Sequence, residues 1–201
     1  SAASDVYKRQ DLHNPCQRQA ALQAIGFTCE VVDPAVLAAQ SNEILTAVIQ
    51  GARKEETSPE VQLAALRALL NSLEFVRLNF EREGERNFIM QVVCEATQSP
   101  HVAIKVAAFE NLVRIMQLYY DKMRFYMEQA LFGLTVLGMR DPEPHVALQA
   151  VEFWSTVCDE EIELSLEAAE ALEFNEEPAH VSYHFAQIAL PEIAPVLMEL
   201  L

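Results

Sequence analysis

Ala21-Leu22-Gln23-Ala24-Ile25 is the first of four related pentads in this 201-residue chain. The later copies are Ala65-Leu66-Arg67-Ala68-Leu69, Ala108-Phe109-Glu110-Asn111-Leu112 and Ala147-Leu148-Gln149-Ala150-Val151. Their first residues are 44, 43 and 39 positions apart. A period near 40 is typical of repeats built from two helices, and it is longer than the ankyrin or tetratricopeptide period. The chain is therefore expected to be a repeat array.

Composition favours the same interpretation. Apolar residues make up 51% of the chain, which holds only 5 glycines. These values suit packed helices and exclude collagen-like, low-complexity and disordered classes. We predict an all-α fold, an α-solenoid of HEAT repeats in which stacked antiparallel helix pairs form a right-handed superhelix. Because each pair buries its apolar face only against its neighbours, function is expected in surface grooves.

Proline follows a capping residue at several expected helix starts, at 14–15, 33–34, 58–59, 99–100 and 141–142. Such pairs begin helices because proline suits the first turn. We expect helices over 14–30, 35–54 (with re-entry at Ser41 as an alternative), 58–80, 84–98, 100–120, 121–139, 142–165 and 181–201. Residues 166–179 could extend the helix and then turn, and Pro191 and Pro195 should kink or divide the last helix.

These helices are expected to group into repeats. The predicted units are a non-native or disordered leader over 1–13, the second helix of a truncated repeat over 14–32, repeats over 35–80, 81–120 and 121–179, and the first helix of a truncated repeat over 180–201.

Charge is distributed unevenly. All 14 Lys and Arg lie in residues 1–140, whereas residues 141–201 contain 14 Asp and Glu and neither Lys nor Arg. An anionic surface disfavours nucleic acid and anionic lipid and attracts a basic protein. The alternative is that these acidic residues only solvate helix faces.

The motifs of catalytic and cofactor sites are missing. The glycines form no phosphate-binding loop, so no nucleotide or other cofactor is expected. His180 and His184 could share a helical face as metal ligands, but a third ligand is not evident, and ordinary surface histidines are favoured. Acidic neighbours should raise the pKa of Cys158, which argues against a catalytic thiolate. Scattered cysteines favour a reducing, intracellular compartment, and the apolar runs are too short to span a membrane.

Four segments resemble the importin beta family of karyopherins, which are nuclear import receptors: SNEILTAVIQG (41–51), LLNSLEF (69–75), NFIMQVVCEAT (87–97) and EFWSTVCDEE (152–161). The similarity runs from about residue 14 to the end and corresponds to the fourth through eighth HEAT repeats of that family. It implies a transport receptor without enzymatic activity that shuttles between cytoplasm and nucleus through the nuclear pore.

The resemblance implies a site for nucleoporins rich in phenylalanine-glycine repeats. In this family, first helices of adjacent repeats on the convex face accept Phe rings in shallow pockets. The matching positions are Leu45, Thr46, Ile49, Glu85, Phe88 and Ile89. Spacings of three and four place each trio along one helical stripe. Ile49 is expected on the pocket floor, where it already faces water and an Asp would be tolerated. Without the resemblance, inter-repeat core would be the simpler interpretation.

The resemblance also implies binding of Ran-GTP on the concave face, where Glu152 and Asp159 match acidic positions that face a basic patch on Ran. Importin alpha or basic cargo would be further partners of the full-length protein. Two alternatives use the same architecture: a HEAT scaffold such as a phosphatase regulatory subunit, and a helical domain attached to an enzyme. The second lacks any combination of nucleophile, base and oxyanion donor.

Overall fold

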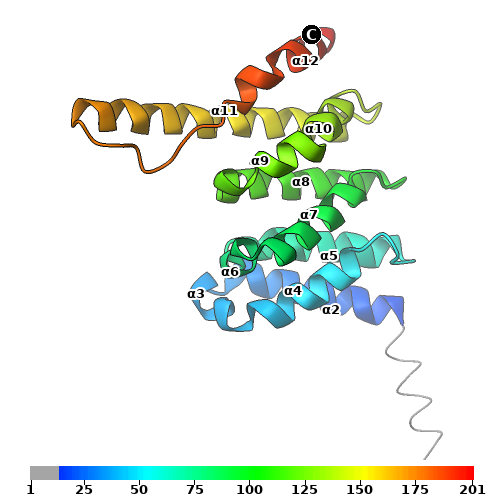
Figure 1. Cartoon of the computed structure of the whole chain (residues 1–201). Coiled ribbons are helices and arrows are strands. Elements are labelled where there is room, and N and C mark those ends of the chain that lie inside the picture. The colour runs from blue at the N-terminus through cyan, green and yellow to red at the C-terminus, as the bar shows by residue number, and fades with distance from the viewer. Residues whose placement is uncertain (1–13) are drawn as a thin grey trace, which may run out of the picture. The chain divides into compact units, whose positions relative to one another are not determined.

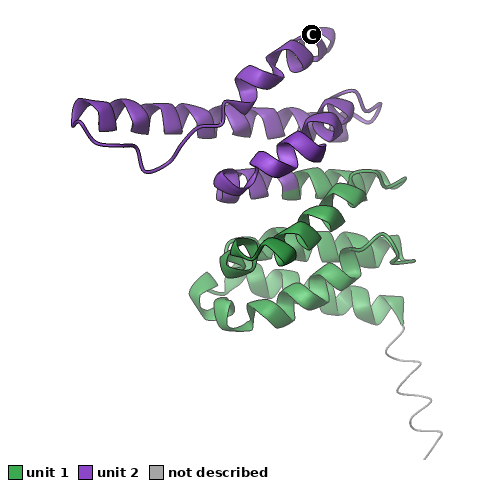
Figure 2. Ribbon diagram, viewed as in Figure 1, with its two compact units in different colours: residues 1–111 green, residues 112–201 purple. Residues whose placement is uncertain are grey.

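The computed structural model describes residues 14–201, so the predicted leader over 1–13 lies outside the described residues. The described residues form helices and connecting turns, without a strand, in the α-solenoid of HEAT repeats that the sequence predicts (Figure 1). The chain divides into two compact units, with the boundary between Asn111 and Leu112 inside one helix (Figure 2). None of the described helices is long and apolar enough to cross a bilayer.

Three of the five predicted start signals begin a helix as expected, whereas the helices after the pairs at 99–100 and 141–142 start two residues later than predicted, at Val102 and Pro144. At those two places the Ser99 hydroxyl and the Asp141 carboxylate accept hydrogen bonds from the amides of His101 and Glu143, in a turn that precedes the helix. Helix α2 (Pro15–Val31) follows Asn14, whose side chain accepts a hydrogen bond from the Cys16 amide at 3.0 Å. Asp33 caps the short helix α3 (Pro34–Leu37) in the same way, and Ser58 caps α5 (Pro59–Ser72). Each cap satisfies an amide that lacks a partner in the first helical turn, and the following proline has no amide to satisfy.

The first unit consists of two layers of helices. Helix α5 packs on α2 and also on α4 (Ser41–Ala52), which in turn packs on α7 (Glu83–Ala96). The first half of α8 (Val102–Tyr119) joins α5 through a buried amide, because Asn111 donates a hydrogen bond to the Leu66 carbonyl oxygen at 2.9 Å. The second pentad lies in this interior: Ala65, Leu66, Ala68 and Leu69 are fully buried.

Two helices expected in this unit are broken. The segment predicted as 35–54 consists of α3, the 3-10 turn η1 (Ala38–Gln40) and α4, so the re-entry at Ser41 is confirmed. The helix predicted over 58–80 is wrong, because α5 ends at Ser72 and a separate helix α6 spans Arg77–Glu81. The Ser72 hydroxyl donates back to carbonyls of its own last turn, which competes with helix continuation.

The second unit contains the rest of α8 and a longer hairpin. After η2 (Tyr120–Lys122), the short helix α9 (Arg124–Tyr126), the π-helical turn η3 (Met127–Leu131) and α10 (Phe132–Met139) follow one another. Helix α10 packs on α11 (Pro144–Glu173). Inside this contact the Trp154 indole donates to the Thr135 hydroxyl at 3.1 Å, so the buried indole N–H is satisfied.

Helix α11 continues to Glu173, as the possible extension over 166–179 suggested, and the chain then turns at Asn175, whose φ is 53°. A non-helical segment runs back along α11 in Figure 1. Helix α12 spans Phe185–Glu199, so the predicted start at 181 is wrong. The Glu161 carboxylate accepts hydrogen bonds from the Phe185 and Ala186 amides and fixes this later start.

Pro191 and Pro195 lie inside α12 without dividing it. Both prolines are exposed, so water can satisfy the carbonyl groups that lose their helical partners. The expectation was that they kink or divide the last helix, and division is wrong.

Two glycines give a matched test of this packing. A Cβ added at Gly51 would lie 2.9 Å from Leu22 Cδ1 and 3.0 Å from Ala65 Cβ, whereas nothing lies within 4 Å of one added at Gly84. We expect Gly51→Ala to lower the free energy of unfolding by about 1 kcal/mol, because overpacking outweighs the gain in helix propensity. Gly84→Ala should raise it by about 0.5 kcal/mol. Urea denaturation followed by circular dichroism measures both, and a stabilised Gly51→Ala would contradict the close approach.

Candidate functional site

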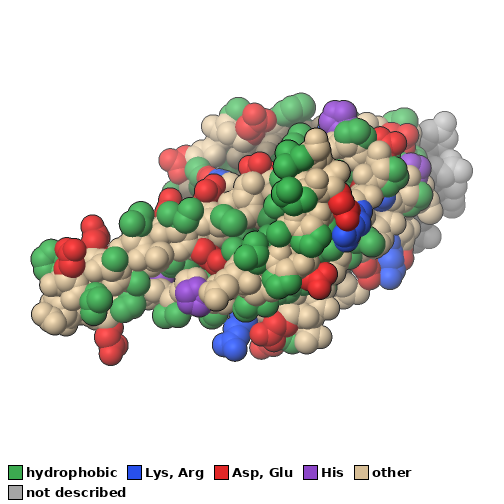
Figure 3. Space-filling model, turned by 90° about the horizontal axis from the view of Figure 1, so that it is seen from above, with side chains coloured by type: hydrophobic (Ala, Val, Ile, Leu, Met, Phe, Trp, Pro, Cys, Tyr) green, Lys and Arg blue, Asp and Glu red, His purple; other side chains and the backbone are tan. Residues whose placement is uncertain are grey.

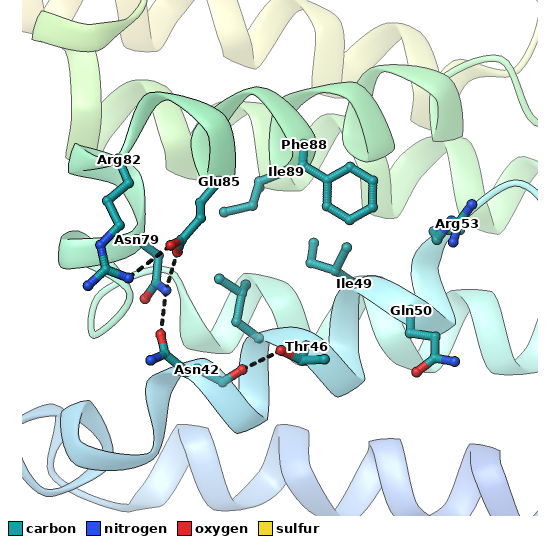
Figure 4. A pocket seen from close by; sticks show the side chains of 11 residues that line it. Asn42, Thr46, Ile49, Gln50, Arg53, Asn79, Arg82, Glu85, Phe88 and Ile89 are labelled. Atoms are coloured by element: carbon teal, nitrogen blue, oxygen red, sulfur yellow. Dashed lines mark hydrogen bonds and ion pairs between the residues drawn. The ribbon is translucent and has the colours of Figure 1, made fainter.

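A groove lies between α4 and α7 in the first unit (Figure 4). Its volume is about 450 Å³. The lining residues come from α4 and α7 and from α6 with the turns beside them: Asn42, Leu45, Thr46, Ile49, Gln50, Arg53, Asn79, Arg82, Glu85, Phe88 and Ile89. All six positions implied by the family resemblance are among them. The structure therefore brings together, around one cavity, residues separated by 36 to 44 positions in the sequence.

The apolar side of this α4–α7 groove has a buried floor and one exposed ring. Ile89 is 1% exposed and Ile49 4%, whereas Phe88 is 45% exposed. The inter-repeat core and the groove thus share the same residues, since the buried side chains pack the helices together and also border the cavity. Phe88 offers most of the aromatic surface that a second apolar side chain could cover.

The expectation that Ile49 faces water and would tolerate Asp is wrong. At 4% exposure, a carboxylate at this position would be almost completely removed from water. An unpaired buried charge destabilises a protein strongly, so Ile49→Asp would disturb folding as well as any binding. Phe88 and the exposed Thr46 are the positions that can be changed without this effect.

A hydrogen-bond network occupies the polar end of the groove. The Asn79 amide nitrogen, from α6, donates to Asn42 Oδ1 at 2.8 Å and to Glu85 Oε2 at 2.6 Å (Figure 4). Arg82 donates to the other Glu85 oxygen at 2.8 Å. The bonds from Arg82 and Asn79 lower the pKa of Glu85, so this carboxylate is ionised at neutral pH.

The opposite end of the groove carries a cation. The Arg53 guanidinium carbon lies 6.0 Å from the centre of the Phe88 ring, within the range of cation–π attraction. Arg53 also pairs with Glu55 at 3.2 Å. An aromatic ring entering the groove would meet apolar side chains below it and hydrogen-bonding groups at both ends.

Sequence reasoning missed five lining residues. Gln50 and Arg53 continue the stripe of Thr46 and Ile49 at spacings of four, so helical periodicity alone could have found them. Arg82 lies three residues before Glu85. Asn42 lies on the same stripe, three residues before Leu45, so periodicity could have found it as well. Asn79 had no such signal, because the break after Ser72 that places it beside the groove was not predicted.

Glu152 and Asp159 lie on α11 in the second unit, and both are exposed. Seven residues correspond to about 10 Å along a helix axis, close to two turns. Within residues 14–201 neither carboxylate forms an ion pair. Figure 3 shows acidic side chains beside hydrophobic ones on the surface that includes the far end of α11. Burial raises the pKa of the neighbouring Glu160, and the charges of Glu163 and Asp159 raise it further.

The two histidines are exposed and do not share a helical face, so the structure does not support the alternative in which they act together as metal ligands. His180 lies before α12 and contacts the Glu167 carboxylate at 3.1 Å, and His184 is the left-handed residue that precedes α12, with φ of 57°. No group of three potential metal ligands occurs within the described part of the chain.

Burial raises the pKa of the thiols of Cys29, Cys94 and Cys158. Burial raises the pKa of the Cys158 thiol, and Glu161 and Asp159 raise it further, as the acidic neighbours predicted. Burial, followed by the charge of Glu95, raises the pKa of Cys94 to about 12. Thiols with such pKa values are protonated at neutral pH and are poor nucleophiles.

Curated proteins described as importin subunit beta-1 match most of this chain. Importin subunit beta-1 of Schizosaccharomyces pombe is 62% identical over 92% of the chain, and that of Saccharomyces cerevisiae is 49% identical over 92%. Each match covers 21% of the relative, so the chain spans about a fifth of the length of the curated relatives it matches. No protein-family model matches the chain.

Solved structures of importin beta match as well. One, determined in an ammonium sulfate condition, has a TM-score of 0.85 at 53% identity and covers 92% of this chain and 22% of its own. A complex of Kap95 with Nup1 has a TM-score of 0.83 at 48% identity, over 91% of this chain and 21% of Kap95. A structure of Kap95p with RanGDP has a TM-score of 0.80 at 48% identity, over 90% and 21%. By sequence and by fold, the chain is a member of the importin beta family, homologous to about a fifth of importin subunit beta-1.

Proposed function

We propose that this chain is a nuclear import receptor segment that binds phenylalanine-glycine nucleoporins in the α4–α7 groove and contributes to Ran-GTP binding through α11. The proposal rests on one observation: all six residues implied by the family resemblance line the same cavity, and one of them, Phe88, is exposed at its edge. A relative of similar fold, Kap95, has been solved in complex with Nup1.

The chemistry of the groove suits an aromatic side chain flanked by small residues. Burial of a Phe side chain contributes roughly 1.5–3 kcal/mol, which allows one weak contact per groove. Several weak contacts in parallel give useful avidity while each one dissociates rapidly, and such binding suits passage through a pore lined with repeats. Glycine next to the ring would leave the main chain free to reach the polar groups at either end of the groove.

The acidic face of α11 supports the second part of the proposal. Exposed Glu152 and Asp159 lie among acidic neighbours in a region without Lys or Arg, which would attract a basic partner such as the basic patch of Ran. Kap95p has been solved with RanGDP at a TM-score of 0.80 to this chain. Importin alpha or basic cargo, and shuttling between cytoplasm and nucleus, belong to the same proposal.

This role works through binding and involves no catalysis. A HEAT scaffold such as a phosphatase regulatory subunit would share the helix pairs, but it would not require an exposed aromatic ring beside an apolar groove. Binding to phenylalanine-glycine peptides separates the two functions.

Phe88→Ala tests the groove. Because Phe88 is 45% exposed, its truncation should leave the melting temperature within a few degrees of wild type. Loss of this apolar side chain should lower the affinity for a labelled Phe-Gly peptide about fivefold, as measured by fluorescence anisotropy. The matched control is Phe27→Ala, which removes an equally large ring that is 66% exposed on α2, outside the groove. Equal weakening by both variants would show that the groove is not the binding site.

Charge reversal tests the acidic face. Glu152→Lys together with Asp159→Lys should weaken binding of Ran-GTP, in a chain extended to the full length of its relatives, and the loss should be larger at 50 mM than at 300 mM salt. Each exposed ion pair contributes only about 0.2–1 kcal/mol, so a several-fold effect is expected from the pair. Exposed Glu192→Lys on α12 serves as the control. Unchanged binding at low salt would remove α11 from the Ran surface.

A further inference from the structure

We infer that Asn79, a residue that the family resemblance did not assign, is a positioning residue of the α4–α7 groove. Its buried amide ties the two walls together at the polar end and thereby sets a width that favours a flat aromatic ring over a branched aliphatic side chain. This inference rests on the proposed binding of Phe-Gly peptides to the groove.

The amide is buried and its orientation is determined by its partners. Asn79 is 2% exposed, and its nitrogen donates at 2.8 Å to Asn42 Oδ1 and at 2.6 Å to Glu85 Oε2. A carboxylate oxygen can only accept, so the atom facing Glu85 must be the nitrogen. Asn79 Oδ1 is consequently left without a hydrogen-bond partner among the described residues. A buried amide with one unsatisfied atom costs stability, and the two donor bonds of Asn79 offset that cost.

The two acceptors belong to opposite walls of the groove. Asn42 lies in the first turn of α4, and Glu85 lies in the first turn of α7. Asn79 itself comes from α6, the short helix that leads into α7. In Figure 4 its side chain lies between Asn42 and Glu85, at the end of the groove away from Arg53. One nitrogen therefore fixes the separation of the two helix starts.

Asn79 also orients the Glu85 carboxylate. The Glu85 side chain is 39% exposed and borders the cavity, so without restraint it could sample several rotamers. Asn79 and Arg82 each hold one of its oxygens, and both bonds lower its pKa. Each Glu85 carboxylate oxygen has one hydrogen-bond partner and therefore keeps a lone pair that can accept a hydrogen bond from a main-chain N–H of a ligand.

A fixed width has a consequence for specificity. Leu and Phe side chains contribute similar burial energies, so apolar area alone separates them poorly. A groove whose walls are held together at one end can widen less to take a branched side chain than a groove without that restraint. Wild-type protein should therefore prefer a Phe-Gly peptide over the Leu-Gly peptide of otherwise identical sequence, and loss of the tie should reduce that preference.

Asn79→Leu tests the inference, because Leu has a similar volume and cannot donate. The matched control is Asn111→Leu. Asn111 is another fully buried Asn of the same unit; its nitrogen donates to the Leu66 and Ala107 carbonyls, away from the groove. Both Asn111 Oδ1 and Asn79 Oδ1 lack a partner among the described residues. Affinities for the Phe-Gly, Leu-Gly and Ser-Gly peptides are measured for the 201-residue chain, and the pKa of Glu85 is followed by carboxyl NMR.

We expect Asn79→Leu to reduce the ratio of Phe-Gly to Leu-Gly affinity about fivefold and to raise the pKa of Glu85 toward its ordinary value. Asn111→Leu should lower the melting temperature and leave both the ratio and the pKa unchanged. A ratio within twofold of wild type, with an unmoved pKa in Asn79→Leu, would overturn the inference while leaving the proposed function intact. Wild-type protein that binds Phe-Gly no better than Ser-Gly would instead overturn the proposed function.

A second variant covers the case in which Asn79→Leu fails to fold. Asn42→Ala removes the α4 end of the tie at an exposed position, where folding is not at risk. It should reduce the affinity ratio about twofold to threefold. An unchanged ratio in folded Asn42→Ala would also overturn the inference.

Discussion

Burial of α4 against α2 and α5 is the constraint on which the first unit depends. Gly51 permits this approach, because any Cβ there would press on Leu22 and Ala65. With one face of α4 committed to the interior, Val48 is fully buried, and the adjoining stripe that contains Leu45 and Ile49 meets α7. The groove is the space that remains where α4 and α7 diverge above this shared floor. Its position therefore follows from the packing of the repeats.

Ile49 and Ile89 pack the helices together and also line the groove. Because these nearly buried residues contribute both to stability and to the cavity, a large-to-small or charged substitution at either one alters folding and binding together. The exposed rim residues Asn42, Thr46 and Phe88 can be varied separately. Binding in a shallow surface groove suits weak, repeated contacts.

The fold was predictable where local signals agree. The pentad period, the caps Asn14, Asp33 and Ser58 and the six groove positions all follow from residue type and spacing, or from similarity to a family. The break between α5 and α6 was not predictable, since it depends on the Ser72 hydroxyl and on buried Phe75 and Val76, whose apolar character fits a helix equally well. The placement of Asn79 depends on that break. Similarly, the start of α12 is fixed by Glu161, 24 residues earlier in the chain.

The central claim is that a Phe side chain binds between α4 and α7. Methyl NMR of protein labelled at Ile and Leu, titrated with the Phe-Gly peptide, tests it most directly, because an aromatic ring shifts the resonances of methyl groups against its face. We predict large shifts at Leu45, Ile49 and Ile89 that saturate with the peptide and are absent with the Ser-Gly peptide. Shifts confined to methyl groups outside the groove, such as those of Leu22 on α2 and Leu63 on α5, would contradict binding between α4 and α7.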